Sequence, residues 1–191
     1  MVRIIRMDEW DRDPGGWRRR TLRCDMKERY SLHRKGDLFY VSMFRTTKVG
    51  VTFEELKMSQ SAACAFSEAA VRFISQVVRP DGDWCIVTAP RRRHADGYHL
   101  ATEVCRKIAA GVKIRFYENA IQCTDKDRIN PEFFLLRPIR EPNVIFYDDI
   151  ITTGSTMLAS YDRYKQQIAY ETYRETGTVL HVLPGLRRQC K

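Results

Sequence analysis

The stretch that decides the fold is residues 144–156, which read Val-Ile-Phe-Tyr-Asp-Asp-Ile-Ile-Thr-Thr-Gly-Ser-Thr. The first four residues are apolar, which is typical of a parallel strand covered on both faces. The carboxylates Asp148 and Asp149 follow, at the carboxyl end of that predicted strand, where open α/β sheets bind their ligands. The remaining residues lead into a predicted helix and carry several hydroxyl groups.

The loop after the two acids has the composition of a phosphate site. Unsatisfied backbone N–H groups and the helix dipole both favour an anion at such a place. The candidate phosphate-binding residues are Thr152, Thr153, Gly154, Ser155 and Thr156. The segment thus has two acids at its start and a candidate phosphate site after them. This suits a ligand with a diol at one end and a phosphate at the other, such as ribose 5-phosphate. The alternative is a solvated turn with exposed acids and a helix cap at Ser155 or Thr156, which accounts for fewer of these features together.

Helices and strands alternate from Ser61 onward. Helical spacing of apolar residues predicts helices over 61–77, 98–110 and 156–175, and Gly111 is expected to stop the second. Short apolar runs predict strands over 84–89, 112–117, 133–136, 144–147 and 178–183. Strands separated by helices imply right-handed crossovers and therefore a parallel sheet.

Residues 1–58 differ from the rest of the chain. They contain the breaker Pro14-Gly15-Gly16 and many charges, and the pattern predicts a β-hairpin with strands over 37–44 and 49–53. We therefore expect an N-terminal segment over 1–58 and an α/β core over 59–191. The aromatic residues of this segment suit either core packing or stacking on a base; they are Trp10, Trp17, Tyr40 and Phe44.

Composition excludes several classes of protein. The chain has 191 residues and a formal net charge of +9, which suits anionic ligands. None of its six cysteines lies in a Cys-x-x-Cys pair, so zinc-ribbon and thioredoxin assignments fail; Cys64, Cys85 and Cys105 lie in apolar patterns and are expected to be reduced core thiols. No apolar stretch predicts a membrane span and no secretory signal is visible, so a cytoplasmic location is expected.

A second loop of interest follows the predicted strand over 84–89. It carries Pro90, Arg91, Arg92 and Arg93, and it lies at the same edge of the predicted sheet as the two acids. Guanidinium groups match phosphate oxygens, so this loop is a candidate for a second phosphate or a pyrophosphate. The alternative is a basic surface loop.

Residues 144–156 resemble the phosphoribosyl-pyrophosphate (PRPP) loop of the type I phosphoribosyltransferases. The resemblance implies that family's fold, a parallel sheet of about five strands flanked by helices, with residues 1–58 as a hood over the acceptor base. It implies transfer of a phosphoribosyl group from PRPP to a nitrogenous base, with release of pyrophosphate. Asp148 and Asp149 would bind the ribose hydroxyls directly or through Mg²⁺, residues 152–156 the 5-phosphate, and residues 90–93 the pyrophosphate.

Within that family the chain is most similar to the competence protein F-like (ComF-like) members. The similarity rests on residues 97–101 and 128–133, although Asp96 and His99 replace an arginine and an asparagine of the family pattern. The four-cysteine zinc module of those proteins is absent, because Cys24 is the only cysteine in the first sixty residues. Thr152 stands where hypoxanthine-guanine enzymes have an aspartate, so their mechanism is not expected.

The acceptor base cannot be named from these residues, and a homodimer is compatible with the resemblance. Two other functions remain open. The same site could serve a non-catalytic regulator that binds PRPP or a nucleotide. The positive charge, including Arg18-Arg19-Arg20, is also compatible with a ComF-like protein associated with DNA uptake, an alternative that we do not favour.

Overall fold

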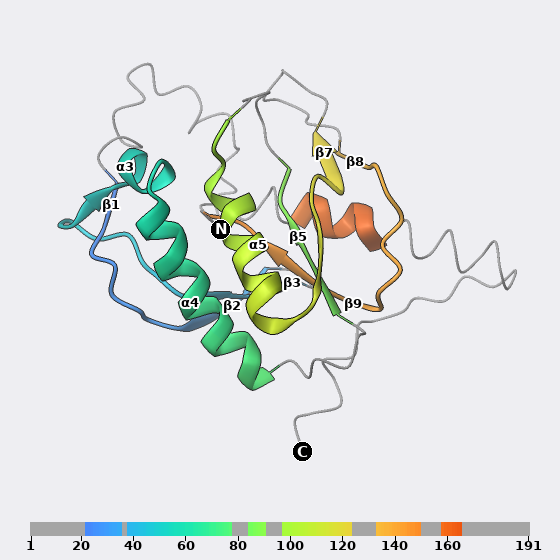
Figure 1. The fold of residues 1–191 in the computed structure, drawn as a ribbon, viewed down its shortest axis with the longest axis horizontal. Coiled ribbons are helices and arrows are strands. Elements are labelled where there is room, and N and C mark those ends of the chain that lie inside the picture. The colour runs from blue at the N-terminus through green and yellow to red at the C-terminus, as the bar shows by residue number, and fades with distance from the viewer. Residues whose placement is uncertain are drawn as a thin grey trace, which may run out of the picture.

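The structure is a computed structural model that describes residues 22–35, 38–77, 84–90, 97–123, 133–149 and 158–165. These residues form an α/β fold, drawn in Figure 1. The strands are β1 (Arg23–Cys24), β2 (Ser31–Lys35), β3 (Leu38–Ser42), β4 (Val51–Thr52), β5 (Trp84–Thr88), β6 (Arg115–Tyr117), β7 (Ile121–Cys123), β8 (Phe133–Leu135) and β9 (Asn143–Tyr147). The helices are α3 (Phe53–Lys57), α4 (Gln60–Val77), α5 (Leu100–Val112) and an unlabelled one over 158–165.

The centre of the fold is a parallel sheet of three strands in the order β6-β5-β9. β5 pairs with β9 along its whole length, from Trp84 opposite Asn143 to Thr88 opposite Tyr147. The predicted parallel arrangement and the strands expected over 84–89 and 144–147 are confirmed. The strand expected over 178–183 lies outside the described residues.

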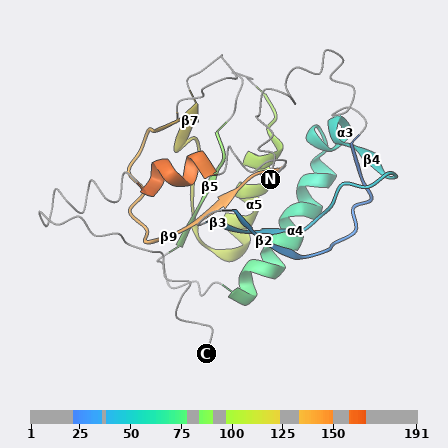
Figure 2. The same ribbon diagram turned by 180° about the vertical axis from the view of Figure 1, so that it is seen from behind.

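Alternate residues of the sheet face two different helical layers. Ile86, Ile145 and Tyr147 pack into the core formed with α4 and α5, whereas Val87 and Phe146 belong to a second core. That second core includes the helix over 158–165, where the Tyr161 and Tyr164 rings meet the Phe146 ring edge-on. The two opposite views show α5 in front of the sheet in Figure 1 and the helix over 158–165 in front of it in Figure 2. Because both faces are covered, continuous apolar strands are favoured.

The short strand expected over 133–136 exists as β8, but it does not extend the parallel sheet. β8 pairs antiparallel with β7, with Ile121 opposite Leu135. Ile121 is buried in the second core, and Leu136 donates a further backbone hydrogen bond to Ala120. The β7–β8 pair thus covers the sheet on the same side as the helix over 158–165.

One carboxylate joins several elements at the amino end of the sheet. Glu141, just before β9, accepts from the Arg115 guanidinium of β6 at 3.1 Å, and its side chain is only 11% exposed. Its backbone carbonyl accepts from the Tyr164 hydroxyl at 3.5 Å. Burial raises the pKa of the Cys85 thiol of β5 to about 12, and the nearby Glu141 adds to this rise. Glu141 therefore links all three strands and the helix over 158–165.

Gly111 does not stop α5, contrary to the sequence prediction. The helix continues to Val112 and ends at Lys113, which adopts the left-handed conformation with φ 60°. Gly111 is instead required for the approach of α4, because a Cβ atom there would lie 2.8 Å from a methyl group of Val71. Gly111 therefore allows α4 to pack closely against α5. The left-handed turn that ends α5 is made by Lys113 and needs no glycine.

The predicted hairpin has the wrong partner strand. β3, which lies in the first predicted strand, pairs with the preceding β2. β4, which lies in the second predicted strand, pairs with β1. The dipeptide Gly36-Asp37 between β2 and β3 is typical of two-residue hairpin loops, so a local signal for the observed pairing was present in the sequence. Local pairing through a two-residue connection costs less chain entropy than closing a longer loop.

The described part of the N-terminal segment packs on α4. The Tyr30 ring stacks on Phe73 with centroids 5.6 Å apart, and Phe44 meets Phe66 at 4.7 Å. Cys24 and Leu56 are buried in the same core as α4 and α5. Helix α4 therefore lies between this segment and α5.

The five cysteines that the structure describes are free thiols, and Cys85 and Cys105 are fully buried, as expected for reduced core residues. Cys64 is half-buried on α4. Within the described ranges, no helix is long and apolar enough to cross a membrane.

We predict that Gly111→Ala destabilises the protein despite the better helix propensity of alanine. Alanine gains about 1 kcal/mol as a helix former, whereas overpacking costs about 1–3 kcal/mol, and the stiff Val71 side chain cannot swing away. Urea unfolding at matched protein concentration should show this loss. In a Val71→Ala background the same substitution should become stabilising; stabilisation of the otherwise unchanged chain would contradict the packing argument.

A second prediction concerns acid stability. The Arg29 guanidinium, which bonds Asp25 in a bidentate pair, lowers the pKa of Asp25 from 3.8 to about 2. A carboxyl with a lowered folded-state pKa stabilises the protein above its unfolded pKa and loses that effect as the pH falls through the folded value. Asp25→Asn should therefore lower the unfolding midpoint at neutral pH, and the difference should shrink as the pH falls from 3.8 towards 2. A difference independent of pH would be evidence against the ion pair.

Candidate active site

The order of the strands creates a topological switch point. From the central strand β5 the chain passes through α5 to β6 on one side, and it later returns to β9 on the other side of β5. In open α/β sheets, ligands bind in the crevice outside the carboxyl ends of the two strands at such a point. Here those strands are β5 and β9.

The ends of β5 and β9 are in register at this point. Thr88 lies opposite Tyr147, and the Ala89 N–H donates to the Tyr147 carbonyl at 2.9 Å. Pro90 follows on one strand and Asp148 and Asp149 follow on the other. The two segments chosen from the sequence as ligand loops therefore leave the sheet side by side.

The acid pair lies close enough to two buried groups, Tyr147 of β9 and Cys105 of α5, to affect their titration. Asp148 and Asp149 are half-buried. Burial raises the pKa of the Tyr147 phenol well above its usual range. The nearby Cys105, Asp149 and Asp148 add to this rise. Desolvation and Asp148 likewise raise the pKa of the Cys105 thiol on α5. Both groups thus stay neutral at physiological pH, and the negative charge here is carried by the two carboxylates.

Two helix N-termini meet at the same edge of the sheet. α5 begins at Leu100 and is capped by His99, whose Nδ1 accepts from the Thr102 N–H at 3.3 Å. Ser59 caps α4, since its Oγ accepts from the Ala62 N–H at 3.1 Å. The Tyr98 hydroxyl donates to the Ser59 carbonyl at 3.1 Å and so ties the start of α5 to the start of α4. The positive ends of two helix dipoles therefore converge near the switch point.

The structure gives His99 a role that its sequence position alone did not reveal. The same Nδ1 lies 2.8 Å from the hydroxyl oxygen of Thr102, so the imidazole contacts both the backbone and the side chain of that residue. Ser59 and Tyr98 were also missed from the sequence; the signal for Ser59 was a serine just before an apolar helical pattern.

The predicted site residues fall into two groups. Asp148, Asp149 and Pro90 are described and lie at neighbouring strand ends. The others lie outside the described residues; they are Arg91, Arg92, Arg93, Thr152, Thr153, Gly154, Ser155 and Thr156. The structure therefore places the start of each candidate loop.

The carboxylates of Asp148 and Asp149 are the candidate metal ligands at the switch point. No group of three or more His, Cys, Asp or Glu side chains that could hold a metal occurs in the part of the chain that the structure describes. Mg²⁺ needs no such group, since it keeps several waters and binds through one or two carboxylates together with substrate phosphates. The adjacent carboxylates of Asp148 and Asp149 fit that mode of binding.

Two of the four aromatic residues that were candidates for base stacking have other partners. Phe44 packs against Phe66 in the core, and Tyr40 stacks on His33 within the β2–β3 hairpin with centroids 4.9 Å apart. Trp10 and Trp17 lie outside the described residues. Core packing, the alternative given for these side chains, accounts for Phe44.

No protein-family model, no curated protein and no solved structure matches this chain.

Proposed function

We propose that this chain is a phosphoribosyltransferase of the type I fold, which transfers a phosphoribosyl group from PRPP to a nitrogenous base and releases pyrophosphate. The observation that carries the proposal is the pair Asp148 and Asp149 at the carboxyl end of β9, beside the end of β5 at the switch point of the sheet. This is where an α/β sheet binds a ligand, and adjacent carboxylates suit a ribose diol. A cytoplasmic location is part of the proposal.

In the proposed reaction, the bond between ribose C1 and the pyrophosphate oxygen breaks and a bond from C1 to a base nitrogen forms. The ribose gains positive charge as the leaving group departs, and the carboxylates of Asp148 and Asp149 stabilise that charge. Residues 152–156 hold the 5-phosphate, and the loop over 90–93 neutralises the pyrophosphate. Mg²⁺, when bound, supplies further cationic charge to the phosphates. The nitrogen that attacks loses its proton, which the departing pyrophosphate can accept.

The convergence of the α4 and α5 N-termini supports an anionic ligand at this edge. Their dipoles favour phosphate groups, while the acid pair favours the hydroxyl end of the same molecule. Tyr147 and Cys105, held neutral by burial, add no competing charge behind the acids. A ligand with phosphates and a diol therefore suits the arrangement better than either an inorganic anion or a neutral sugar.

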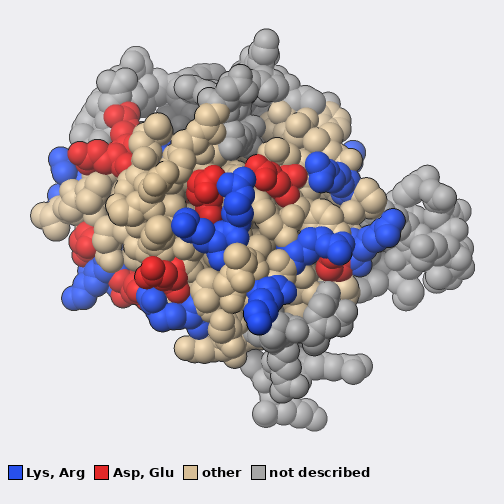
Figure 3. Space-filling model, viewed as in Figure 1, with Lys and Arg blue, Asp and Glu red and all other residues tan. Residues whose placement is uncertain are grey.

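The alternative functions predict different behaviour at the same residues. A regulator would bind PRPP or a nucleotide at this site without releasing pyrophosphate. For nucleic acid, the described face in Figure 3 offers little support, because basic and acidic side chains alternate over it. Arg106 bonds to both Glu103 and Glu118, and Arg115 pairs with Glu141. Such mixed charge is typical of a solvated surface.

Calorimetry of the purified protein with PRPP and Mg²⁺ tests the ligand. We expect micromolar binding that falls by about a factor of ten or more in Asp148→Ala/Asp149→Ala, a loss of about 1.4 kcal/mol or more. Glu28→Gln, which removes a carboxylate paired with Arg72 far along α4, is the matched control and should bind as the parent does. A well-folded parent protein that does not bind PRPP would contradict the proposed ligand.

Pyrophosphate release in the presence of a panel of bases tests the reaction. Asp149→Asn should abolish turnover without unfolding the protein, because it removes a negative charge near the developing cation while leaving the shape of the side chain unchanged. Far-UV circular dichroism checks the fold. Full activity in this variant would refute the assigned role, and PRPP binding without turnover for any base would favour the regulator.

A further inference from the structure

Four polar residues are buried in the part of the chain that the structure describes, namely Ser67, Thr88, Thr102 and Ser160. Buried hydroxyl groups in proteins nearly always have a hydrogen-bond partner, because an unpaired one loses its hydration without compensation. Three of the four follow this rule. The Ser67 hydroxyl donates to the Cys64 carbonyl at 2.8 Å, the Thr102 hydroxyl lies 2.8 Å from Nδ1 of His99, and Ser160 also has a partner.

Thr88 is the exception among these four residues. It is only 6% exposed, and its hydroxyl has no hydrogen-bond partner within the described ranges. Among the described side chains, the only fully enclosed oxygen without a partner is Oε2 of Glu141. The Thr88 oxygen also lacks a partner, so it must keep some access to solvent. A group from outside the chain can therefore reach this hydroxyl, although the residue as a whole is buried.

The unpaired hydroxyl lies at the edge of the sheet that carries the acid pair. Thr88 is the last residue of the central strand β5, and it lies opposite Tyr147, which Asp148 and Asp149 follow directly. Alternate residues of a strand point to opposite faces of the sheet. Ile86, two residues before Thr88, packs into the core formed with α4 and α5. Thr88 therefore points to the side of the sheet on which these two helices begin.

We propose that Thr88 is a substrate-binding residue whose hydroxyl donates to an oxygen of the pyrophosphate group; this inference rests on the proposed function. A hydroxyl can donate to an anionic oxygen, and such charge-assisted bonds are short and strong. The helix dipoles at the starts of α4 and α5 favour negative charge on this side of the sheet. β5 also leads directly into the loop that begins at Pro90. A phosphate oxygen is therefore a better partner for Thr88 than a ribose hydroxyl, which suits the acid pair.

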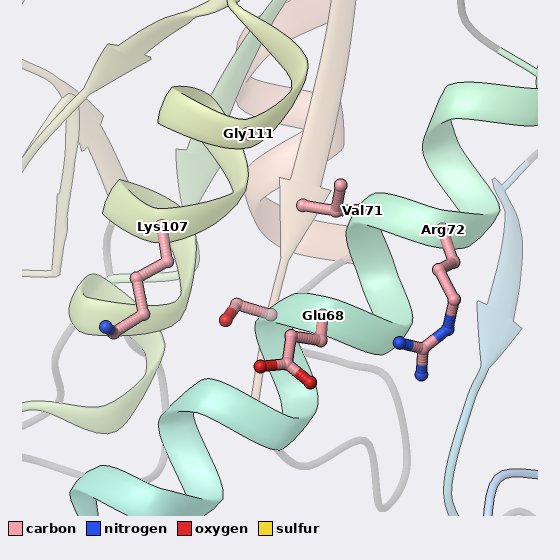
Figure 4. Close-up of a pocket in the computed structure, with 6 residues that line it drawn as sticks. Glu68, Val71, Arg72, Lys107 and Gly111 are labelled. Atoms are coloured by element: carbon pink, nitrogen blue, oxygen red, sulfur yellow. The ribbon is translucent and has the colours of Figure 1, made fainter.

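The groove between α4 and α5, shown in Figure 4, lies away from the strand ends and provides a control position. On α5 it is lined by Lys107 and Gly111, in the second half of that helix. Lys107 is about 10 Å along the helix from Leu100, at a rise of 1.5 Å per residue. Ser67 lines the same groove from α4. Ser67→Ala therefore removes a buried hydroxyl at a distance from the proposed contact.

Calorimetry with pyrophosphate and Mg²⁺ tests the contact. Thr88→Val replaces the hydroxyl with a methyl group of similar size, and the dissociation constant for pyrophosphate should rise about tenfold or more. Ribose 5-phosphate, which has no pyrophosphate, should bind this variant as it binds the parent chain. Thr88→Ser retains a hydroxyl and should recover most of the affinity for pyrophosphate. Ser67→Ala should bind both ligands as the parent does.

Urea unfolding of the same variants separates binding from a structural role. Replacing an unpaired buried hydroxyl leaves no other group without its partner, so Thr88→Val should be as stable as the parent or more stable. Thr102→Val and Ser67→Ala each break a hydrogen bond of a buried hydroxyl and should lower the urea midpoint. Thr88→Val is therefore expected to lose affinity for pyrophosphate without losing stability.

Four results would each overturn the proposal. They are a parent chain that does not bind pyrophosphate, equal affinity of Thr88→Val and the parent for pyrophosphate, an equal loss of ribose 5-phosphate binding in that variant, and a lowered urea midpoint. Equal affinity would show that the hydroxyl bonds water only. If the parent releases pyrophosphate from PRPP and Thr88→Val does so equally well, the transferase assignment stands and this inference alone fails. Binding of pyrophosphate that depends on Thr88, without turnover for any base, would instead support the inference and contradict the transferase.

Discussion

The parallel pairing of β5 with β9 is the constraint on which the rest of the structure depends. Five consecutive residue pairs align the two strands, and the last backbone hydrogen bond, from Ala89 to Tyr147, fixes where each strand ends. A shift by one residue would turn every side chain of β9 to the opposite face. Ile145 would then leave the α4–α5 core, Phe146 would leave its tyrosine partners, and the acid pair would no longer follow the strand at the level of Pro90.

The parts of the fold that were predictable from sequence are those governed by local pattern. The apolar runs of β5 and β9 and the helical spacing of α4 each identify an element without knowledge of its neighbours. The acid pair was recognisable because it directly follows such a run. Its environment was not, since the proximity of Cys105 and the link from Tyr98 to Ser59 depend on how α5 packs.

The failures of prediction also have physical causes. Gly111 has the sequence signature of a helix stop, but its actual role depends on Val71 of another helix, which local sequence does not contain. The hairpin was assigned to the wrong strands because alternation alone gives no partner, and the short connection at Gly36-Asp37 decides between the candidates. The expected strand over 133–136 formed, but its direction was set by the neighbouring β7.

The contacts of Glu141 cross-link the strands at one end of the sheet, the end opposite the acid pair. At the amino end, one residue ties β6, β5, the start of β9 and the helix over 158–165 into a single unit. At the carboxyl end, Pro90 follows β5 and Asp148 and Asp149 follow β9, and no such contact is described between them. Loops on such a base can change in length or sequence without disturbing strand register, so that new ligand preferences can arise at one end of the sheet while the other end preserves the fold.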